Sequence, residues 1–531
     1  MNGNVPFKNI YSNDTTHLEN CTSPYRAKGA DFSPEQLRQS VKELQGLADA
    51  HFIQLAHGQV PWYQSKLYPM KEHLDWWSEY FEVPREQLER LRGFTGYVRD
   101  GGDILQDFID ACREFGQAAF VSLRMNDEHH IENCDKKGHT RGIHSISRFA
   151  MEHRQFMFGE DLTVWSNRAQ NWINPEVRDF MFSIISEQCE NYDIDGFELD
   201  FMRYPDLFDL ERTSLDERRA IMSEFITRVR RELDRTERGG KHRYLCIRVP
   251  SSIPMLDNIG VELESLYALG VEMLNVSSSY FTEQYIDFEG FCKGARDVAV
   301  YFEICHCTTI GTALNANGYD NFRYRRTTPN EIYTTAHMAY SHGAQGMSYF
   351  NFVYYREHGS EGRGPFNEPP FEVIGKAKDK DFVASAPKHF FLAKGWHSSS
   401  HVSQLGPMLP CNTDVELQMY VKESEDAWQG DFRARIMTRT PIGDRRVSLT
   451  FGGYAAVPDG DISEPYVEDN AYVPMHGDSE NSLAWRVPRE AVRDGINKFV
   501  LRFESDAQND EIRVDYIDLF PYVTDKKGSE K

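Results

Sequence analysis

The feature that most constrains the fold of this sequence is an alternation of short strands with amphipathic helices over residues 1–385. Capping boxes at Ser33-Pro34-Glu35-Gln36 and Thr328-Pro329-Asn330-Glu331 mark two of the helix starts. A doubly wound sheet would need a glycine-rich loop after its first strand, and the sequence has none there. The spacing, roughly 48 residues per unit, therefore predicts a (β/α)8 barrel with enlarged loops. The eight expected strands are residues 7–12, 51–57, 117–124, 194–201, 244–249, 271–277, 298–305 and 346–351.

The pattern changes in the last third of the chain. Strand-like runs without proper helices between them are expected at residues 415–421, 432–438, 446–451, 499–503 and 512–520. We therefore predict an α/β protein with two domains, a (β/α)8 TIM barrel at 1–385 and a C-terminal antiparallel β-sandwich at 386–531. The second domain could bind carbohydrate, cover a barrel edge or build a homo-oligomer.

Composition excludes several classes of partner. The formal net charge is -23, which disfavours binding to nucleic acid. No apolar run is long enough to span a membrane, and residues after Met1 do not resemble a leader, so we expect a cytoplasmic protein as the sequence stands, or an exported one if a signal peptide was removed. Nine scattered cysteines indicate reduced thiols.

The expected fourth strand brings two carboxylates close together. Side chains alternate along a strand, so Glu198 and Asp200 share one face while Phe197 and Leu199 share the other. Two adjacent anions are unfavourable unless they have a function or pair with a cation. The sequence leaves both readings open, with Arg203 or another arginine as the partner in an ion pair.

Catalytic groups of a TIM barrel lie at the carboxyl ends of its strands. Asp200 on the fourth strand and Glu303 on the seventh both meet this condition. Two such carboxyl groups are what glycoside hydrolysis requires, because one protonates the leaving oxygen while the other attacks the anomeric carbon or activates water. Glu198 lies two residues deeper and is expected to support the site without touching the substrate.

The segment Asp195-Gly196-x-x-Leu199-Asp200-x-x-Arg203-Tyr204-Pro205 resembles the Asp-Gly-x-x-x-Asp-x-x-Arg-Tyr-Pro signature of the family-ten-like glycosyl hydrolases. This resemblance implies a (β/α)8 glycosidase. The layout is also similar to a larger clan of retaining glycosidases, which implies that Asp200 is the acid/base and Glu303 the nucleophile. This chain has Leu199-Asp200 where that clan has Asn-Glu.

Polar and aromatic residues near the strand ends are candidates for substrate binding. The arginines could bind an anionic sugar or pair with the site's own carboxylates, and the aromatic residues could stack on a sugar or belong to the core. Cys305-His306-Cys307 is expected to be a plain strand end. The candidates are Arg124, Asn126, His129, His130, Arg203, Tyr204, Arg248, Asn275, Trp62, Tyr280 and Asn351.

The sequence therefore predicts a glycoside hydrolase acting on an oligo- or polysaccharide, anionic sugars included, without a metal or other cofactor. Two alternatives remain open. A metal-dependent hydrolase barrel would place His57, Asp127, His129 and Glu303 around a cation. A non-catalytic carbohydrate-binding protein would keep the aromatic residues and arginines but would not need two opposed carboxylates.

Overall fold

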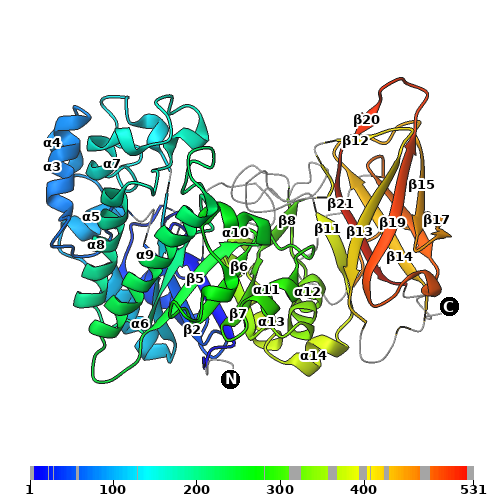
Figure 1. Ribbon diagram of the computed structural model, residues 1–531, viewed down its shortest axis with the longest axis horizontal. Helices are drawn as coiled ribbons and strands as arrows, with labels where there is room; N and C mark the ends of the chain where they lie inside the picture. Colours follow the sequence, from blue (N-terminus) through cyan, green and yellow to red (C-terminus); the bar gives the residue numbers. More distant parts are fainter. Residues whose placement is uncertain are drawn as a thin grey trace. The chain divides into compact units, whose positions relative to one another are not determined.

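Eight parallel strands close into a barrel, as the alternation of strands and helices predicts (Figure 1). In this computed structural model the order around the barrel is β1-β10-β7-β6-β5-β4-β3-β2, so strands from β1 to β7 each neighbour the next in sequence. The strands are β1 (Asn9–Asp14), β2 (Ala50–Gln54), β3 (Ala118–Arg124), β4 (Gly196–Asp200), β5 (Tyr244–Pro250), β6 (Met273–Ser277), β7 (Ala299–Cys305) and β10 (Gly346–Phe350).

The structure describes most of the chain. The described residues are 5–21, 23–27, 29–55, 59–127, 129–279, 281–309, 324–356, 368–393, 404–406, 408–423, 428, 430–466 and 479–522.

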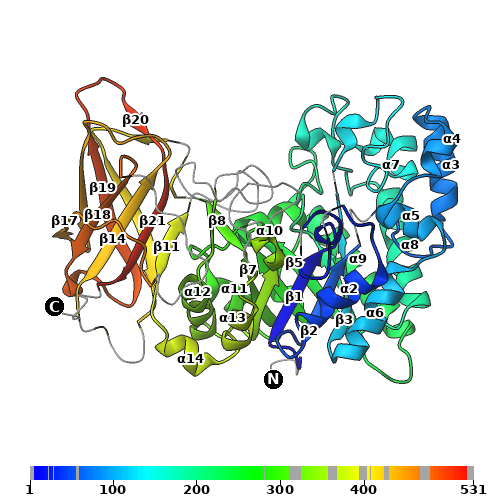
Figure 2. The same cartoon turned by 180° about the vertical axis from the view of Figure 1, so that it is seen from behind.

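Helices cover the outside of the barrel strands, as Figures 1 and 2 show from opposite sides. The predicted capping boxes form at Ser33 and Thr328, and each is followed by a proline in the first turn. The helices are α1 (His17–Asn20), α2 (Pro34–Lys42), α3 (Met70–Tyr80), α4 (Arg85–Leu88), α5 (Gly93–Arg99), α6 (Ile104–Phe115), α7 (Arg148–Glu152), α8 (Pro175–Asn191), α9 (Leu215–Arg235), α10 (Ile253–Ile259), α11 (Phe288–Gly294), α12 (Pro329–Ser341), α13 (Phe371–Lys376) and α14 (Lys380–Ser385). Short 3₁₀ turns are η1 (Ile131–Asn133), η2 (Arg154–Phe156), η3 (Trp165–Arg168), η4 (Leu263–Ser265), η5 (Phe352–Tyr355) and η7 (Arg489–Ala491).

The chain forms two compact units. Unit 1 comprises residues 1–279, 289–303 and 344–351, and it holds the barrel strands apart from the last two residues of β7. Unit 2 comprises residues 280–288, 304–343 and 352–531, and it groups α12, α13 and α14 with the C-terminal sheets. The division at residue 385 stays a prediction.

Antiparallel sheets form the C-terminal part of unit 2, which confirms the predicted β-sandwich class. One sheet has the order β11-β21-β14-β18-β17 and another has the order β13-β19-β15-β16. Two small sheets pair β12 with β20 and β8 with β9. The strands are β8 (Cys307–Thr309), β9 (Tyr324–Arg326), β11 (Phe390–Ala393), β12 (Leu409–Pro410), β13 (Asp414–Val421), β14 (Phe432–Thr438), β15 (Arg446–Phe451), β16 (Tyr454–Ala455), β17 (Val457–Asp459), β18 (Ser482–Val487), β19 (Gly495–Glu504), β20 (Glu511–Ile512) and β21 (Val514–Pro521).

Alternate residues of the barrel strands point inward and form layers. The layer nearest the amino ends of the strands is apolar, and Phe52 stacks on Phe120 with ring centroids 4.4 Å apart. Tyr301 closes this layer by donating its hydroxyl to the carbonyl of Phe7 at 2.7 Å. Such packing makes the barrel interior a solid core rather than a pore. The buried cluster contains Val5, Phe7, Ile10, Ala50, Phe52, Phe120, Cys246, Met273, Ala299 and Tyr301.

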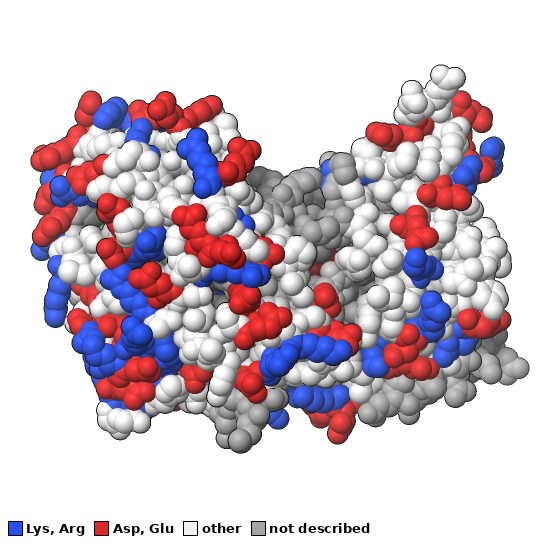
Figure 3. Space-filling model, viewed as in Figure 1, with Lys and Arg blue, Asp and Glu red and all other residues white. Residues whose placement is uncertain are grey.

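The described residues show how charges and thiols are distributed. On the face drawn in Figure 3, acidic and basic side chains are interspersed over the described surface of both units. Within the described residues, no helix combines the length and the apolar composition that crossing a bilayer requires. No disulfide joins the nine cysteines, all of which lie in the described part of the chain.

The glycine of the Asp-Gly motif has a packing role that can be tested. A Cβ atom at Gly196 would lie 2.1 Å from Cε1 of Phe120. We expect Gly196→Ala to lower the free energy of unfolding by about 1–3 kcal/mol, because overpacking forces the core to shift. Urea-induced unfolding measures this. Gly460→Ala is the control, since no atom lies within 4 Å of the position that a Cβ would take there, and equal stability of the two variants would contradict the prediction.

Candidate active site

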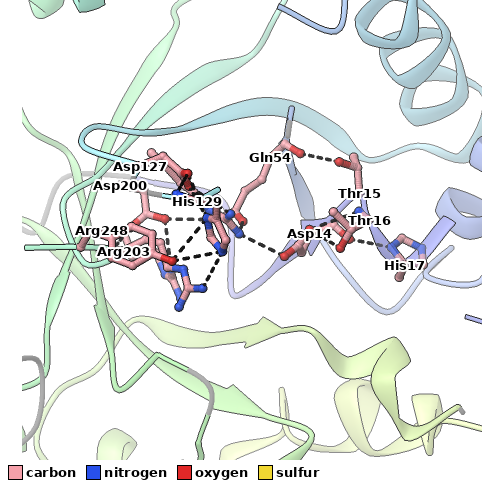
Figure 4. A network of polar contacts seen from close by, with 12 residues as sticks. Asp14, Thr15, Thr16, His17, Gln54, Asp127, His129, Asp200, Arg203 and Arg248 are labelled. Carbon is pink, nitrogen blue, oxygen red and sulfur yellow. Dashed lines mark hydrogen bonds and ion pairs between the residues drawn. The ribbon is translucent and has the colours of Figure 1, made fainter. Parts of the chain in front are cut away.

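A layer of charged and amide side chains lies at the carboxyl ends of the barrel strands (Figure 4). It occupies the inward-facing positions above the apolar core, and all of its members are buried. The strands deliver these side chains to one level because parallel strands in a barrel end at the same face. The members are Asp14, Gln54, Arg124, Asp200, Arg248, Ser277 and Glu303.

Arg248 on β5 joins the two predicted catalytic carboxylates. Its Nη1 donates to Oδ2 of Asp200 at 2.8 Å. Its Nε and Nη2 donate to the two oxygens of Glu303 at 2.8 and 2.7 Å, which is a bidentate ion pair. Burial opposes the charge of Arg248, but Asp200 and Glu303 outweigh it and raise the pKa of the guanidinium. The arginine therefore stays charged and binds Asp200 and Glu303 through different nitrogens of one planar group.

Asp200 accepts four hydrogen bonds. Oδ1 accepts from the backbone N–H groups of Met202 and Arg203, both at 3.1 Å. Oδ2 accepts from Nε2 of Gln54 at 3.2 Å as well as from Arg248. Asp200 thus caps the turn that follows β4 and also contacts the charged layer, so it fixes the backbone as well as the charge of the site.

Glu303 on β7 is held by Arg248 and Ser277. Besides the two bonds from Arg248, its Oε1 accepts from the hydroxyl of Ser277 at 2.5 Å. Burial raises the pKa of Glu303, and the charge and hydrogen bonds of Arg248, together with Ser277, act in the opposite direction. Glu303 is therefore a carboxyl group whose environment favours a retained proton more than water does.

The charged layer continues to β1 through Arg124. Its Nη2 donates to Asp14 at 3.1 Å and to Oε1 of Gln54 at 2.9 Å. Its Nη1 donates to Asp127 at 3.4 Å. Gln54 accepts from Arg124 and donates to Asp200, so its amide links the two halves of the layer. Anions and cations consequently alternate around the barrel mouth.

Glu198 lies one layer deeper, as its position in the strand predicts. It accepts from Ser122 at 2.6 Å and from Asn275 at 3.1 Å, and Sγ of Cys246 is 3.4 Å away. Burial raises the pKa of Glu198 to about 7, against an opposing effect of Arg248. Its hydrogen bonds with the described residues go to this deeper layer, so a supporting role would act through charge.

A second polar cluster forms where the loop after β3 meets the turn after β4. Nδ1 of His129 lies 2.9 Å from both oxygens of Asp127. Nε2 of the same ring lies 3.1 Å from Nη2 of Arg203 and 3.1 Å from the hydroxyl of Tyr204. The ring of Trp165 packs 5.4 Å from Tyr204, and this tryptophan is 49% exposed. The structure thus brings together three predicted substrate-binding residues.

Strained backbone marks the same face of the barrel. Four residues other than glycine adopt a positive φ shortly after a barrel strand: His130 (66°), Tyr204 (61°), Ser279 (66°) and Asn351 (51°). Left-handed backbone is unfavourable for residues with a side chain, and such strain collects at functional sites. These conformations make the carboxyl-end face a candidate location for the function.

Asn351 differs from the other predicted amides. It is 1% exposed, and neither its Nδ2 nor its Oδ1 has a hydrogen-bond partner among the described residues. Asn126 instead donates to the backbone carbonyls of Gln170 and Asp206, and it thereby connects the segments that contain these two residues. Buried polar groups are normally paired, so the amide of Asn351 has unused capacity to donate and to accept.

Other predicted residues lie elsewhere. Trp62 is buried against Phe94, with ring centroids 4.4 Å apart, so in this conformation it belongs to the core. His130 packs edge-on against His144. Tyr280 and His57 lie outside the described residues.

Sequence reasoning missed Asp14, Gln54 and Ser277 as members of the site. Each is the last residue of its strand, on β1, β2 and β6, respectively. A polar residue at the carboxyl end of a barrel strand is the sequence signal that could have identified them. It could not show that Gln54 links Arg124 to Asp200, since these residues lie on different strands.

The proposed metal ligands do not form one group among the described residues. Asp127 and His129 contact each other, whereas Glu303 binds Arg248. In unit 2, the donor atoms of Cys305, His306 and Cys307 lie within 4.8 Å of one another. Burial and the nearby charge of Arg326 lower the pKa of His306 well below its usual range.

Comparisons with known proteins give fold likeness only. No family model matches the sequence, and no curated protein matches it. The structure is similar to that of α-L-fucosidase isoenzyme 2 from Paenibacillus thiaminolyticus, with a TM-score of 0.39 and 14% identity over 70% of this chain and 49% of that chain. This chain thus spans about half the length of that fucosidase.

Two further solved structures are similar at the same level. An α-amylase from Geobacillus thermoleovorans has a TM-score of 0.38 and 10% identity over 94% of this chain and 99% of that chain. A class V chitinase from Pseudomonas fluorescens has a TM-score of 0.38 and 10% identity over 70% of this chain and 100% of that chain. Likeness at this level assigns no activity, so the functional assignment rests on the residues of the site.

The buried Glu198 makes stability depend on pH. Its pKa of about 7 exceeds its ordinary value of 4.5, so the folded chain binds a proton that the unfolded chain has lost between these pH values. The contribution of Glu198 to the free energy of unfolding is fully present below pH 4.5 and is lost as the pH rises towards 7. The shift corresponds to about 3 kcal/mol.

We therefore expect Glu198→Gln to flatten the pH dependence of the free energy of unfolding. Relative to the unsubstituted protein, the variant should gain about 3 kcal/mol between pH 4.5 and pH 8. Urea titrations at several pH values measure this difference. Glu86→Gln, at an exposed position, is the control. A constant difference between variant and parent across this range would refute the assignment.

Proposed function

We propose that this protein is a glycoside hydrolase that cleaves a glycosidic bond in an oligo- or polysaccharide. The observation that carries the proposal is the placement of Asp200 and Glu303, from β4 and β7, on one guanidinium at the carboxyl-end face. Glycoside hydrolysis needs two carboxyl groups on fixed sides of the anomeric centre. Arg248 supports this geometry because it restrains both groups at once.

In the proposed reaction Glu303 is the proton donor. Burial raises the pKa of Glu303, which favours the protonated form that can donate to the glycosidic oxygen. As the bond between the anomeric carbon and that oxygen breaks, the proton moves from Glu303 to the oxygen. Water then supplies the hydroxyl of the new hemiacetal and returns a proton to the carboxylate.

Asp200 is the ionised partner in this proposal. Its four hydrogen bonds, two of them from backbone N–H groups, fix its position at the carboxyl end of β4. A negative charge beside the anomeric carbon stabilises an oxocarbenium-like transition state. The resemblance to retaining glycosidases implies the opposite roles, so the assignment of acid and partner needs its own experiment.

Substrate binding is proposed for the polar groups beside the charged layer. The amide of Asn351 can donate to and accept from one sugar hydroxyl, which is itself both a donor and an acceptor. Arg203 and Tyr204 offer further hydrogen-bonding groups, and the exposed Trp165 offers an aromatic surface next to Tyr204. A carbohydrate is the ligand class that fits this combination.

One observation favours a second candidate, a carbohydrate-binding protein without catalysis. Arg248 is paired with both carboxylates and neutralises charge that a catalyst would use. A broad panel of glycans separates the two functions, because a binding protein retains ligands without releasing reducing ends.

We expect Asp200→Asn and Glu303→Gln each to lower kcat/KM by about 10²–10⁴-fold while the fold is retained. The measurement is release of nitrophenol from a panel of nitrophenyl glycosides, with circular dichroism to monitor folding. Glu152→Gln, an exposed residue that pairs with Arg148, is the matched control. Normal turnover by either site variant would remove that residue from the mechanism.

The roles of the two carboxyl groups are distinguished by the leaving group. A dinitrophenyl leaving group departs without protonation, so it should restore much of the rate of the variant that lacks the proton donor. We expect this rescue for Glu303→Gln and little rescue for Asp200→Asn. The reverse pattern would instead support the roles that the resemblance implies.

Activity is also expected to persist after treatment with a chelator. Glu303 is held by Arg248 in the charged layer, and Asp127 is hydrogen-bonded to His129. Dialysis against EDTA followed by a rate measurement tests this, with elemental analysis to show whether the protein holds a metal. Loss of activity that added zinc restores would support a metal-dependent hydrolase.

A further inference from the structure

Asp127 and His129, in the loop after β3, are joined by a side-chain hydrogen bond. Asp127 is 6% exposed, and Nδ1 of His129 lies 2.9 Å from both of its oxygens. The backbone N–H of His129 also donates to Oδ1 of Asp127 at 2.9 Å. A carboxylate only accepts when ionised, so this contact assigns the ring proton to Nδ1.

The opposite nitrogen of the ring then becomes an acceptor. Nε2 of His129 can accept from Nη2 of Arg203 at 3.1 Å. The hydroxyl of Tyr204 lies 3.1 Å from the same nitrogen and 3.3 Å from Nδ1, so it contacts the edge of the ring between the two nitrogens. The guanidinium of Arg203 also lies over the ring of Tyr204, 4.7 Å from its centroid. One imidazole therefore orients two neighbouring side chains of the turn after β4.

That turn also carries hydrogen bonds to Asp200. The backbone N–H of Arg203 donates to Oδ1 of Asp200, and Tyr204 follows with a φ of 61°. The strained conformation of Tyr204 persists only if the surroundings hold it. The contacts with His129 are part of those surroundings, so the loop after β3 restrains the backbone that binds Asp200.

We infer that Asp127 and His129 are a positioning pair for the proposed reaction. Asp127 fixes the tautomer and orientation of His129, and His129 holds Arg203 and Tyr204 as substrate-binding groups beside Asp200 (Figure 4). The pair acts through these residues and does not contact the reacting atoms. This inference rests on the proposed glycosidase function for its effect on rate, but the tautomer exists independently of that function.

The first experiment tests the tautomer without reference to activity. Protein labelled with ¹⁵N-histidine gives separate nitrogen shifts for Nδ1 and Nε2, and the signal of His129 is identified by its loss in His129→Gln. We expect protonated Nδ1 in the unsubstituted protein. In Asp127→Asn one carboxylate oxygen is replaced by an NH2 group, which can donate to Nδ1. We therefore expect the ring proton to shift towards Nε2 and the backbone amide signals of Met202 and Arg203 to move.

Asp135→Asn is the matched control, because Asp135 is an exposed aspartate further along the same loop that pairs with Arg154. It should leave the His129 signals unchanged. Finding Nδ1 of His129 unprotonated in the unsubstituted protein, or an unchanged tautomer in Asp127→Asn, would overturn the inference.

The second experiment measures coupling through a double-mutant cycle. We expect His129→Ala to lower kcat/KM by about 10–100-fold, as substitution of residues that orient a site commonly does. If His129 acts through Tyr204, the variant carrying both His129→Ala and Tyr204→Phe should lose about as much as the worse single variant. Additive losses would show that His129 does not act through Tyr204, and the inference would fail.

The two levels of failure are distinguishable. If the unsubstituted protein hydrolyses no glycoside, the proposed function fails, while the histidine tautomer and the amide signals of Met202 and Arg203 still report on the pair. His153→Ala provides a control for loss of a histidine, because Nδ1 of His153 lies 2.9 Å from the carbonyl of Phe149, one turn earlier in the chain. It should leave kcat/KM unchanged.

Discussion

The charge of Arg248 is the constraint on which the centre of this barrel depends. Asp200 and Glu303 are both buried, and a carboxylate in a medium of low polarity loses its hydration. The guanidinium contacts both and provides hydrogen bonds as well as charge. Arg124 does the same for Asp14 and, at a longer distance, for Asp127, so the mouth of the barrel is a connected set of paired charges rather than a collection of isolated ones.

The layers beneath the charged residues determine where these residues lie along the barrel axis. Phe120 occupies the space that a side chain at position 196 would need, which places Glu198 in the next layer and Asp200 above it. Glu198 satisfies its oxygens with Ser122 and Asn275, away from the charged layer. The apolar core, the deeper carboxyl group and the charged mouth therefore follow from a single alternation along the strands.

Asp200 connects the turn after β4 with the rest of the charged layer. Its two backbone hydrogen bonds shape the turn after β4, and its bonds to Gln54 and Arg248 join that turn to the charged layer. His129 holds the same turn from the other side through Arg203 and Tyr204. A rigid turn serves catalysis and carbohydrate binding equally well, since both require groups that are oriented before the ligand arrives.

The sequence by itself determined the barrel, the antiparallel sheets that follow it, and the inward placement of Glu198 and Asp200, because hydrophobic periodicity and helix caps are local properties. It also identified Arg248 and Arg124 as residues at strand ends, but it left open whether they pair with carboxylates or await a ligand. Only the tertiary structure decided that Arg248 bridges Asp200 and Glu303, that Gln54 links Arg124 to Asp200, and that Trp62 is buried. These contacts join residues far apart in sequence, and no local pattern specifies which side chains of neighbouring strands come within hydrogen-bonding distance.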